Sequence, residues 1–296
     1  MTGIALPSGV IVAPATPMDG ELHIDYDALA DDVERLIAAG VHGLTPCAIT
    51  AEAETLDLGE HRRVLQTTVE AAAGRVPVYC GIGRPSILEL RTLIDHVHDI
   101  GGDGLFLITP YASAHTADEV AAHFLDVVER AELDTIIYNC PGYSGVHLVP
   151  ELISDLADHS KVVGIKEGHQ PQLAETVQQA GDRLAVLTAR DSYLMPSMAV
   201  GAVGVVSFAA NVEPEAHVAL YDAIAVGDLP RAERLHQAIC DLVDALVARS
   251  YPVLIKEAMH LKGRAIGSAR RVATPISSAE RLRIAQAIDG VARAMA

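Results

Sequence analysis

Two stretches of the chain decide its fold. Residues 134–141 read Asp-Thr-Ile-Ile-Tyr-Asn-Cys-Pro, and residues 162–168 read Val-Val-Gly-Ile-Lys-Glu-Gly. Each is a short apolar run without strict alternation that ends in polar residues and Pro or Gly. That pattern is typical of a strand buried on both faces of a parallel sheet. Six further runs show it, at residues 9–17, 43–50, 76–83, 104–110, 184–191 and 204–211.

Segments with helical periodicity lie between these runs. Residues 25–40 begin with an Asp that can cap a helix, place Leu29, Val33 and Leu36 on one face, and end at a Gly. Seven more segments follow the same rule, at residues 59–73, 86–101, 116–132, 149–159, 170–181, 192–201 and 214–226. Eight strand-like runs that alternate with eight helix-like segments predict an α/β fold, a (β/α)8 TIM barrel, over residues 1–226.

The pattern changes after residue 226, where no further strand-like run occurs. Residues 228–249, 252–262 and 278–294 read as helices, with a loop at residues 263–275. The sequence therefore predicts a barrel followed by a C-terminal three-helix extension over residues 227–296.

Composition excludes several classes of protein. The chain has 296 residues, of which half are apolar and none is Trp, so it is too apolar for a disordered chain. Its 22 basic and 39 acidic residues give a net charge of −17, which argues against nucleic-acid binding and against docking on an anionic membrane. The start resembles no signal peptide, and no apolar run is long enough to span a membrane.

The cysteines bear on compartment and on metal binding. The four cysteines include no Cys-x-x-Cys pair, so free thiols in a reducing cytoplasm are the expected state. Cys47, Cys80 and Cys140 fall near strand ends, but small core residues are a more common role for cysteine than a metal site. We therefore expect a cytoplasmic protein without a metal.

Candidate catalytic residues follow from the rule that barrel active sites lie at the C-terminal ends of the strands. Lys166 closes an apolar run, and burial there would lower its pKa and supply the free amine that attacks a ketone. Tyr138 ends the preceding strand and is a candidate acid–base, and Thr50 offers a hydroxyl and an amide to a carboxylate. From position alone, a salt-bridged lysine, a core tyrosine and a turn threonine remain alternatives. Glu52 and Glu54 are candidate bases, although capping and solvated roles are more common for such residues.

These residues occur in motifs that resemble those of a known family. The chain resembles the dihydrodipicolinate synthase and N-acetylneuraminate lyase family of class I pyruvate aldolases over almost its whole length. The resemblance rests on Tyr-Asn-Cys-Pro-Gly at residues 138–142 and Gly-Ile-Lys-Glu at residues 164–167. Supporting matches lie at residues 16–17, 81–83, 109–111 and 204–211.

The resemblance implies a TIM barrel, usually a homotetramer, that needs no metal or organic cofactor. By residue match, Lys166 forms an imine with the ketone of pyruvate or another 2-oxo acid, and Tyr138 moves the protons. Thr50 and the amide of Ile49 would hold the carboxylate, and Val206 would make an apolar contact. The enamine would then add to an aldehyde, or the reverse cleavage would occur.

The sequence departs from the family pattern at three places. Residues 48–52 read Ala-Ile-Thr-Ala-Glu where the family has Gly-Thr-Thr-Gly-Glu, which removes one donor and predicts a different loop backbone. Tyr111 is followed by Ala112, so the family's relay tyrosine is absent. Tyr143 stands where the synthases carry an arginine for the aldehyde's carboxylate. The absent relay tyrosine and the absent arginine predict a protein other than a true dihydrodipicolinate synthase.

Four more residues complete the candidate site. The segment at residues 143–146 and Asp191 resemble the neuraminate-lyase branch, in which that acidic position recognises hydroxyls. Arg190 and Arg84 are candidates for the missing cation, with a surface ion pair as the alternative for each. Ser207 ends the eighth strand-like run.

The expected function is a Schiff-base lyase that acts on pyruvate or another 2-oxo acid, most simply a class I aldolase with an aldehyde as second substrate. No cofactor beyond the lysine imine is expected, and the expected assembly is a homodimer or homotetramer. The alternatives are a 2-keto-3-deoxy sugar acid dehydratase or synthase of the same family, and a non-catalytic barrel that binds a 2-oxo acid.

Overall fold

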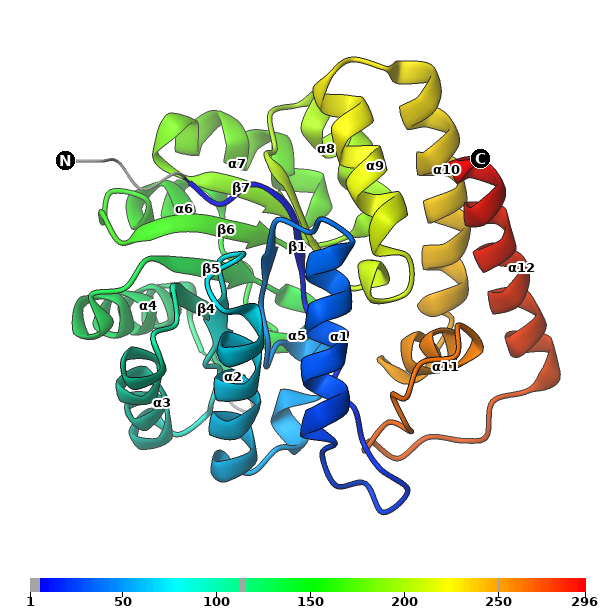
Figure 1. Ribbon diagram of the computed structural model, residues 1–296. Coiled ribbons are helices and arrows are strands. Elements are labelled where there is room, and N and C mark those ends of the chain that lie inside the picture. The colour runs from blue at the N-terminus through cyan, green and yellow to red at the C-terminus, as the bar shows by residue number, and fades with distance from the viewer. Residues whose placement is uncertain (1–5, 112–114, 250) are drawn as a thin grey trace.

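The barrel predicted from the sequence is confirmed. The computed structural model describes residues 6–111, 115–249 and 251–296. Eight parallel strands form one sheet in the order β2-β1-β8-β7-β6-β5-β4-β3. Leu44 of β2 bridges Val78, which directly precedes β3, so the two edges of the sheet meet and the barrel closes. Helices surround the strands (Figure 1).

The strands occupy the predicted runs but are shorter than those runs. They are β1 (Gly9–Val12), β2 (Gly43–Leu44), β3 (Tyr79–Gly81), β4 (Gly104–Ile108), β5 (Thr135–Asn139), β6 (Val162–Glu167), β7 (Ala185–Thr188) and β8 (Gly204–Ser207). The largest difference is at residues 43–50, where only two residues are strand and Ile49–Ala51 form a 3-10 turn. Most apolar residues of that run are buried although they lie outside the strand. The run therefore has the apolar composition of a buried strand, which explains why the predicted strand is too long.

The helices also match the predicted segments. In the barrel they are α1 (Tyr26–Ala38), α2 (Leu58–Ala72), α3 (Ile87–Ile100), α4 (Ala117–Ala131), α5 (Pro141–Ser144), α6 (Pro150–Leu156), α7 (Leu173–Ala180), α8 (Leu194–Ala199) and α9 (Pro214–Ala225). The short α5, which follows β5, was not predicted. Helices α2 and α4 begin at capping boxes, Asp57 with Glu60 and Thr116 with Glu119, which satisfy the first free amides of each helix.

The apolar side chains form two cores. One lies between the strands and the surrounding helices and is built mainly from Val, Leu, Ile and Ala. The second fills the inside of the barrel and includes Phe106, Ile136, Tyr138, Leu187 and Val206. The inner core is apolar up to the mouth, so any polar group placed there loses much of its hydration.

Three helices follow the barrel at the predicted places: α10 (Leu229–Leu246), α11 (Val253–Leu261) and α12 (Ser278–Met295). Figure 1 shows α10 and α12 side by side along one flank of the barrel, with α11 near the lower end of α10. Helix α10 also packs against α9. In the part of the chain that is described, no helix is long and apolar enough to cross a membrane.

A buried ion pair ties this extension to the barrel. Lys256 Nζ of α11 lies 2.9 Å from Glu52 Oε1, and their side chains are 2% and 0% exposed. Lys256 Nζ also donates to the Ser268 carbonyl, and Glu52 Oε2 accepts from the Arg271 amide at 2.9 Å. Glu52, a candidate base in the sequence, is therefore occupied as an anchor between the β2 loop and the extension.

Replacement of Lys256 by Met should lower the free energy of unfolding by about 3–5 kcal/mol, because it leaves the Glu52 carboxylate buried without its partner. Urea unfolding followed by circular dichroism measures this loss. Arg130→Met is the control, since its ion pair with Asp95 is 45% and 67% exposed and is worth at most about 1 kcal/mol. Equal losses in the two variants would contradict the assigned role of the buried pair.

Candidate active site

The pairing of β5 with β6 places the two principal residues side by side. Tyr138 and Lys166 are register partners in these parallel strands. Both side chains therefore point to the same face of the sheet, which is the inside of the barrel. Lys166 Nζ lies 4.4 Å from the centroid of the Tyr138 ring and 5.7 Å from that of Phe106. The expectation that the phenol and the amine face each other across adjacent strands is met by this geometry.

The next register pair, Asn139 and Glu167, points outward and locks the two strand ends together. Asn139 Nδ2 donates to Glu167 Oε1 at 3.0 Å and to the Leu148 carbonyl at 3.2 Å. Glu167 also accepts from Gln172 Nε2 at 2.9 Å and from the His169 amide at 2.6 Å. Burial raises the pKa of Glu167, and these donors oppose the rise. This network holds Tyr138 and Lys166 in register from behind.

Lys166 is poised to act as a nucleophile. Burial in the apolar mouth lowers the pKa of Lys166 to about 8, against the opposing influence of Cys140 and Asp191. A lysine amine attacks a carbonyl only in its neutral form, and this pKa leaves a substantial neutral fraction near physiological pH.

Tyr138 has the properties of a proton carrier that stays protonated at rest. Its side chain is 7% exposed, and its hydroxyl contacts the Cys140 thiol. Burial, with a smaller contribution from Cys140, raises the pKa of Tyr138 well above its usual value. The phenol can therefore pass a proton between bound groups without resting as a phenolate.

The β2 loop brings Thr50 into the mouth. Cys47 and Glu52 take the left-handed conformation, with φ of 56° and 55°. Ala48 and Ala51, the two alanines that replace family glycines, do not take this conformation, so the loop needs no glycine at either position. Thr50 is 2% exposed, and its Oγ lies 2.8 Å from the hydroxyl of Tyr251.

Six of the predicted site residues line one cavity, which we call the lysine cavity: Lys166, Tyr138, Thr50, Ile49, Tyr143 and Arg190. Arg190 is exposed at its rim. The other wall of the cavity comes from the end of β8 and from the extension, through Phe208, Val247 and Tyr251. The cavity thus combines an amine of lowered pKa, a phenol and a hydroxyl pair in one apolar recess.

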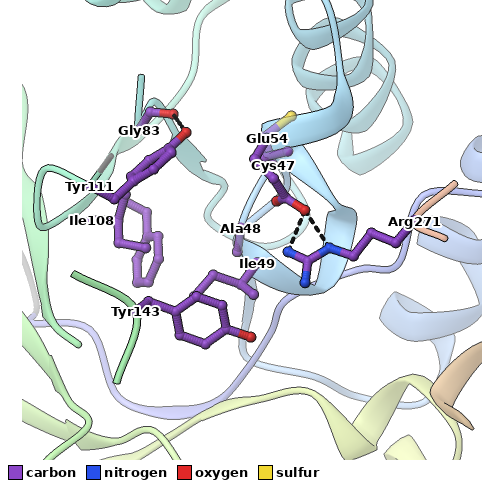
Figure 2. A pocket seen from close by; sticks show the side chains of 11 residues that line it. Cys47, Ala48, Ile49, Glu54, Gly83, Ile108, Tyr111, Tyr143 and Arg271 are labelled. Carbon is purple, nitrogen blue, oxygen red and sulfur yellow. Dashed lines mark hydrogen bonds and ion pairs between the residues drawn. The ribbon is translucent and has the colours of Figure 1, made fainter. Parts of the chain in front are cut away.

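Tyr111 lines a second, more apolar cavity of about 90 Å³, which we call the side cavity. Ile49, Tyr143, Phe106 and Ile108 form much of its wall, and the first two also line the lysine cavity. In Figure 2, Tyr111 and Ile108 face Ala48 and Ile49 across this space. The Tyr111 hydroxyl donates to the Gly83 carbonyl at 3.3 Å. Ala112, which stands where the family has its relay tyrosine, lies outside the described residues.

Arg271 brings a positive charge to the rim of the side cavity. Its Nε donates to Glu54 Oε1 at 2.5 Å, and Figure 2 shows the pair beside Tyr143. The guanidinium also contacts the Tyr143 hydroxyl and opposes the rise that burial causes in the pKa of Tyr143. Glu54, the other candidate base, is thus the ion-pair partner of Arg271.

Three predicted residues are buried and do not line the lysine cavity: Asp191, Ser207 and Val206. The Asp191 carboxylate accepts from Ser207 Oγ, and its Oδ1 lies 3.1 Å from His217 Nε2. These contacts lower the pKa of Asp191, against the opposing effect of burial. Its carboxylate is therefore engaged inside the protein, and the geometry does not support the predicted recognition of substrate hydroxyls.

Arg84 lines neither cavity. Its guanidinium donates to the Leu56 carbonyl at 2.9 Å and lies 3.6 Å from Glu89. The alternative for Arg84 was an exposed arginine in a surface ion pair: the ion pair with Glu89 is present, but the Arg84 side chain is only 9% exposed.

Sequence reasoning missed Tyr251 and Arg271. Both come from the extension, in the connections that flank α11. The break between the two helical patterns at residues 249–252 predicts a connection but not that it returns to the mouth of the barrel.

Within the described residues, no three His, Cys, Asp or Glu side chains are grouped so that they could hold a metal ion. Cys47, Cys80 and Cys140 are buried, and burial raises the pKa of each thiol.

An inward lysine and tyrosine at the ends of adjacent strands of a (β/α)8 barrel define a class: the Schiff-base lyases, or class I aldolases. The sequence model of the dihydrodipicolinate synthetase family matches residues 6–290. A 4-hydroxy-tetrahydrodipicolinate synthase of Geotalea daltonii is 37% identical over 275 residues, covering 92% of this chain and 94% of that protein. The chain belongs to the dihydrodipicolinate synthase family and is a lyase.

Solved structures agree. The dihydrodipicolinate synthase of Aquifex aeolicus superposes with a TM-score of 0.89 at 31% identity, covering 95% of this chain and 97% of that one. The chloride-inhibited synthase of Acinetobacter baumannii, solved in complex with pyruvate, gives 0.91 at 30% identity and covers 97% and 99%. The names of these relatives argue against our expectation that the chain is not a true dihydrodipicolinate synthase, which rested on Tyr143 and Ala112.

The low pKa of Lys166 is open to a direct test. Acetic anhydride modifies only neutral amines, so competitive labelling read by mass spectrometry should give Lys166 a midpoint near pH 8. Labelling should fall as the pH drops below that value, because the amine becomes charged. A midpoint near about 10.4, the value of an unperturbed lysine, would contradict the desolvated site.

Proposed function

We propose that the protein joins pyruvate, or a closely related 2-oxo acid, to an aldehyde through a covalent imine on Lys166. The observation that carries this proposal is the position of Lys166 in the apolar mouth, beside Tyr138 and with a lowered pKa. No other described lysine lines the lysine cavity.

The residues divide the chemistry between them. The neutral Lys166 amine attacks the ketone carbon, and the carbonyl oxygen leaves as water. The resulting protonated imine draws electrons from the neighbouring carbon, which loses a proton and becomes an enamine. The enamine carbon then forms a bond to the aldehyde carbon, whose oxygen takes up a proton as its double bond opens. Water hydrolyses the resulting imine, which releases the product and restores the Lys166 amine, and Tyr138 carries protons during these steps.

The second substrate would enter through the side cavity. We propose aspartate semialdehyde, the aldehyde of the true synthases, as the first candidate because of the relatives' names. Arg271 supports it, since its guanidinium lies beside Tyr143, the residue that replaces the family's carboxylate-binding arginine. The apolar wall of the side cavity favours a second candidate, a less polar aldehyde.

We further propose a cytoplasmic location and a homo-oligomeric assembly. All four cysteines are free thiols, which suits a reducing compartment. The assembly follows from the resemblance to a family whose members are usually oligomers.

Borohydride reduction in the presence of pyruvate should add the reduced three-carbon acid to Lys166, as read by peptide mass spectrometry. Lys166→Arg should give no adduct, because a guanidinium forms no imine under these conditions. Lys161→Arg is the matched control and should leave labelling intact, since Lys161 directly precedes β6, at the end of the strand away from Lys166, and pairs with Asp134. Absence of an adduct in the parent protein with pyruvate and with longer 2-oxo acids would contradict the mechanism.

A product screen separates the candidate reactions. With pyruvate, the protein should consume aspartate semialdehyde or a less polar aldehyde, and Tyr138→Phe should slow turnover by about 10²–10⁴-fold while the imine still forms. Loss of water from a 2-keto-3-deoxy sugar acid without any aldehyde condensation would favour the dehydratase. An imine without any turnover would favour the non-catalytic barrel.

A further inference from the structure

Tyr251, which belongs to the extension, brings its hydroxyl to the predicted site residue Thr50 inside the lysine cavity. Its hydroxyl lies 2.8 Å from Thr50 Oγ, and both side chains line the cavity with Lys166. The Tyr251 ring packs edge-on against Phe208, with centroids 5.4 Å apart. The hydroxyl is therefore held in place from two directions, by packing on the ring and by the hydrogen bond.

The position of this hydroxyl pair matches the needs of a 2-oxo acid. The carboxylate carbon is bonded directly to the ketone carbon that Lys166 attacks, so the carboxylate must lie deep in the cavity beside the amine. Thr50 is 2% exposed, whereas Arg190 is exposed at the rim. A buried carboxylate needs donors, because an unsatisfied charge in an apolar recess is costly.

The local sequence leaves a shortage of such donors. Ile49 has no hydroxyl, so the β2 loop offers only Thr50 as a side-chain donor at this point. Tyr251 is a neutral donor as well, since burial raises its pKa well above the usual value and keeps the phenol protonated. In the free protein one hydroxyl donates to the other, and both can rotate to donate to an arriving anion.

We infer that Tyr251 is a substrate-binding residue that, together with Thr50, receives the carboxylate of the 2-oxo acid. The inference rests on the proposed function and assigns one step of it, recognition of the acid group, to the C-terminal extension. The specificity that follows is for a 2-oxo acid over the corresponding ester or neutral ketone, because two hydroxyl donors reward an acceptor that carries a full negative charge.

The test compares pyruvate with methyl pyruvate in the parent protein, in Tyr251→Phe and in Tyr221→Phe. Tyr221 is the control because it lies in α9, packs its ring on His42 and lines neither the lysine cavity nor the side cavity. In Tyr251→Phe the pyruvate concentration that half-saturates borohydride labelling of Lys166 should rise about tenfold, the effect of one hydrogen bond to a charged group. The value for methyl pyruvate should stay within about twofold, and Tyr221→Phe should match the parent for both.

Two results would overturn the inference. One is an unchanged half-saturation for pyruvate in Tyr251→Phe, and the other is an equal rise for pyruvate and its ester, which would indicate a general loss of packing. If the parent itself gives no adduct, the proposed function fails separately. Calorimetric binding of pyruvate to Lys166→Ala, with and without Tyr251→Phe, then still decides the role of Tyr251: weaker binding in the double variant supports it, and equal binding refutes it.

Discussion

The parallel register between β5 and β6 is the constraint on which the site depends. It sets Tyr138 opposite Lys166 and Asn139 opposite Glu167. Side chains alternate between the two faces of a strand, so a slip of one residue would place Glu167 inside the barrel and Lys166 among the helices. The outward pair guards against that slip, since Asn139 and Glu167 are joined to each other and to the following loops by hydrogen bonds. Tyr138 and Lys166 are thus positioned by residues that do not line the lysine cavity.

Burial of a charged amine in an apolar barrel is costly. The pKa of Lys166 is lowered to about 8, so part of the population carries a neutral amine and this cost is reduced. Asp191 moderates the effect. Its carboxylate is held by Ser207 and His217 and attracts positive charge at Lys166 from a distance. In the proposed mechanism a protonated imine restores that charge once substrate is bound, so the same carboxylate would favour the intermediate. The net charge of −17 would repel an anionic substrate at long range, so recognition of such a substrate would depend on groups that line the lysine cavity.

The sequence was sufficient for the barrel and for the residues placed by strand periodicity. Lys166 and Tyr138 could be predicted because each closes a run whose inner and outer faces follow from the fold. Thr50 was found from its motif, although its run proved to be a 3-10 turn rather than a strand. Asp191 was expected at the mouth, but its neighbours Ser207 and His217 come from β8 and α9, and no local pattern reveals such a contact. Tyr251 and Arg271 were missed for the same reason, since they reach the mouth from connections that follow the barrel.

The extension completes the site because charge pairs fasten it to the segment that follows β2. Glu52, Glu54 and Glu60 all come from that segment. Each pairs with a residue of the extension: Lys256, Arg271 and Arg270 respectively. The pairs converge on the loop in which alanines replace the family's glycines and Ile49 replaces a hydroxyl. These ion pairs fix the position of the loop from the side of the extension. Tyr251 of the same extension makes a hydrogen bond with Thr50, the residue of the loop that keeps its hydroxyl. The changes in the loop and the residues of the extension are therefore best understood as one arrangement, in which the barrel supplies the amine and the phenol and the extension fixes the geometry around them.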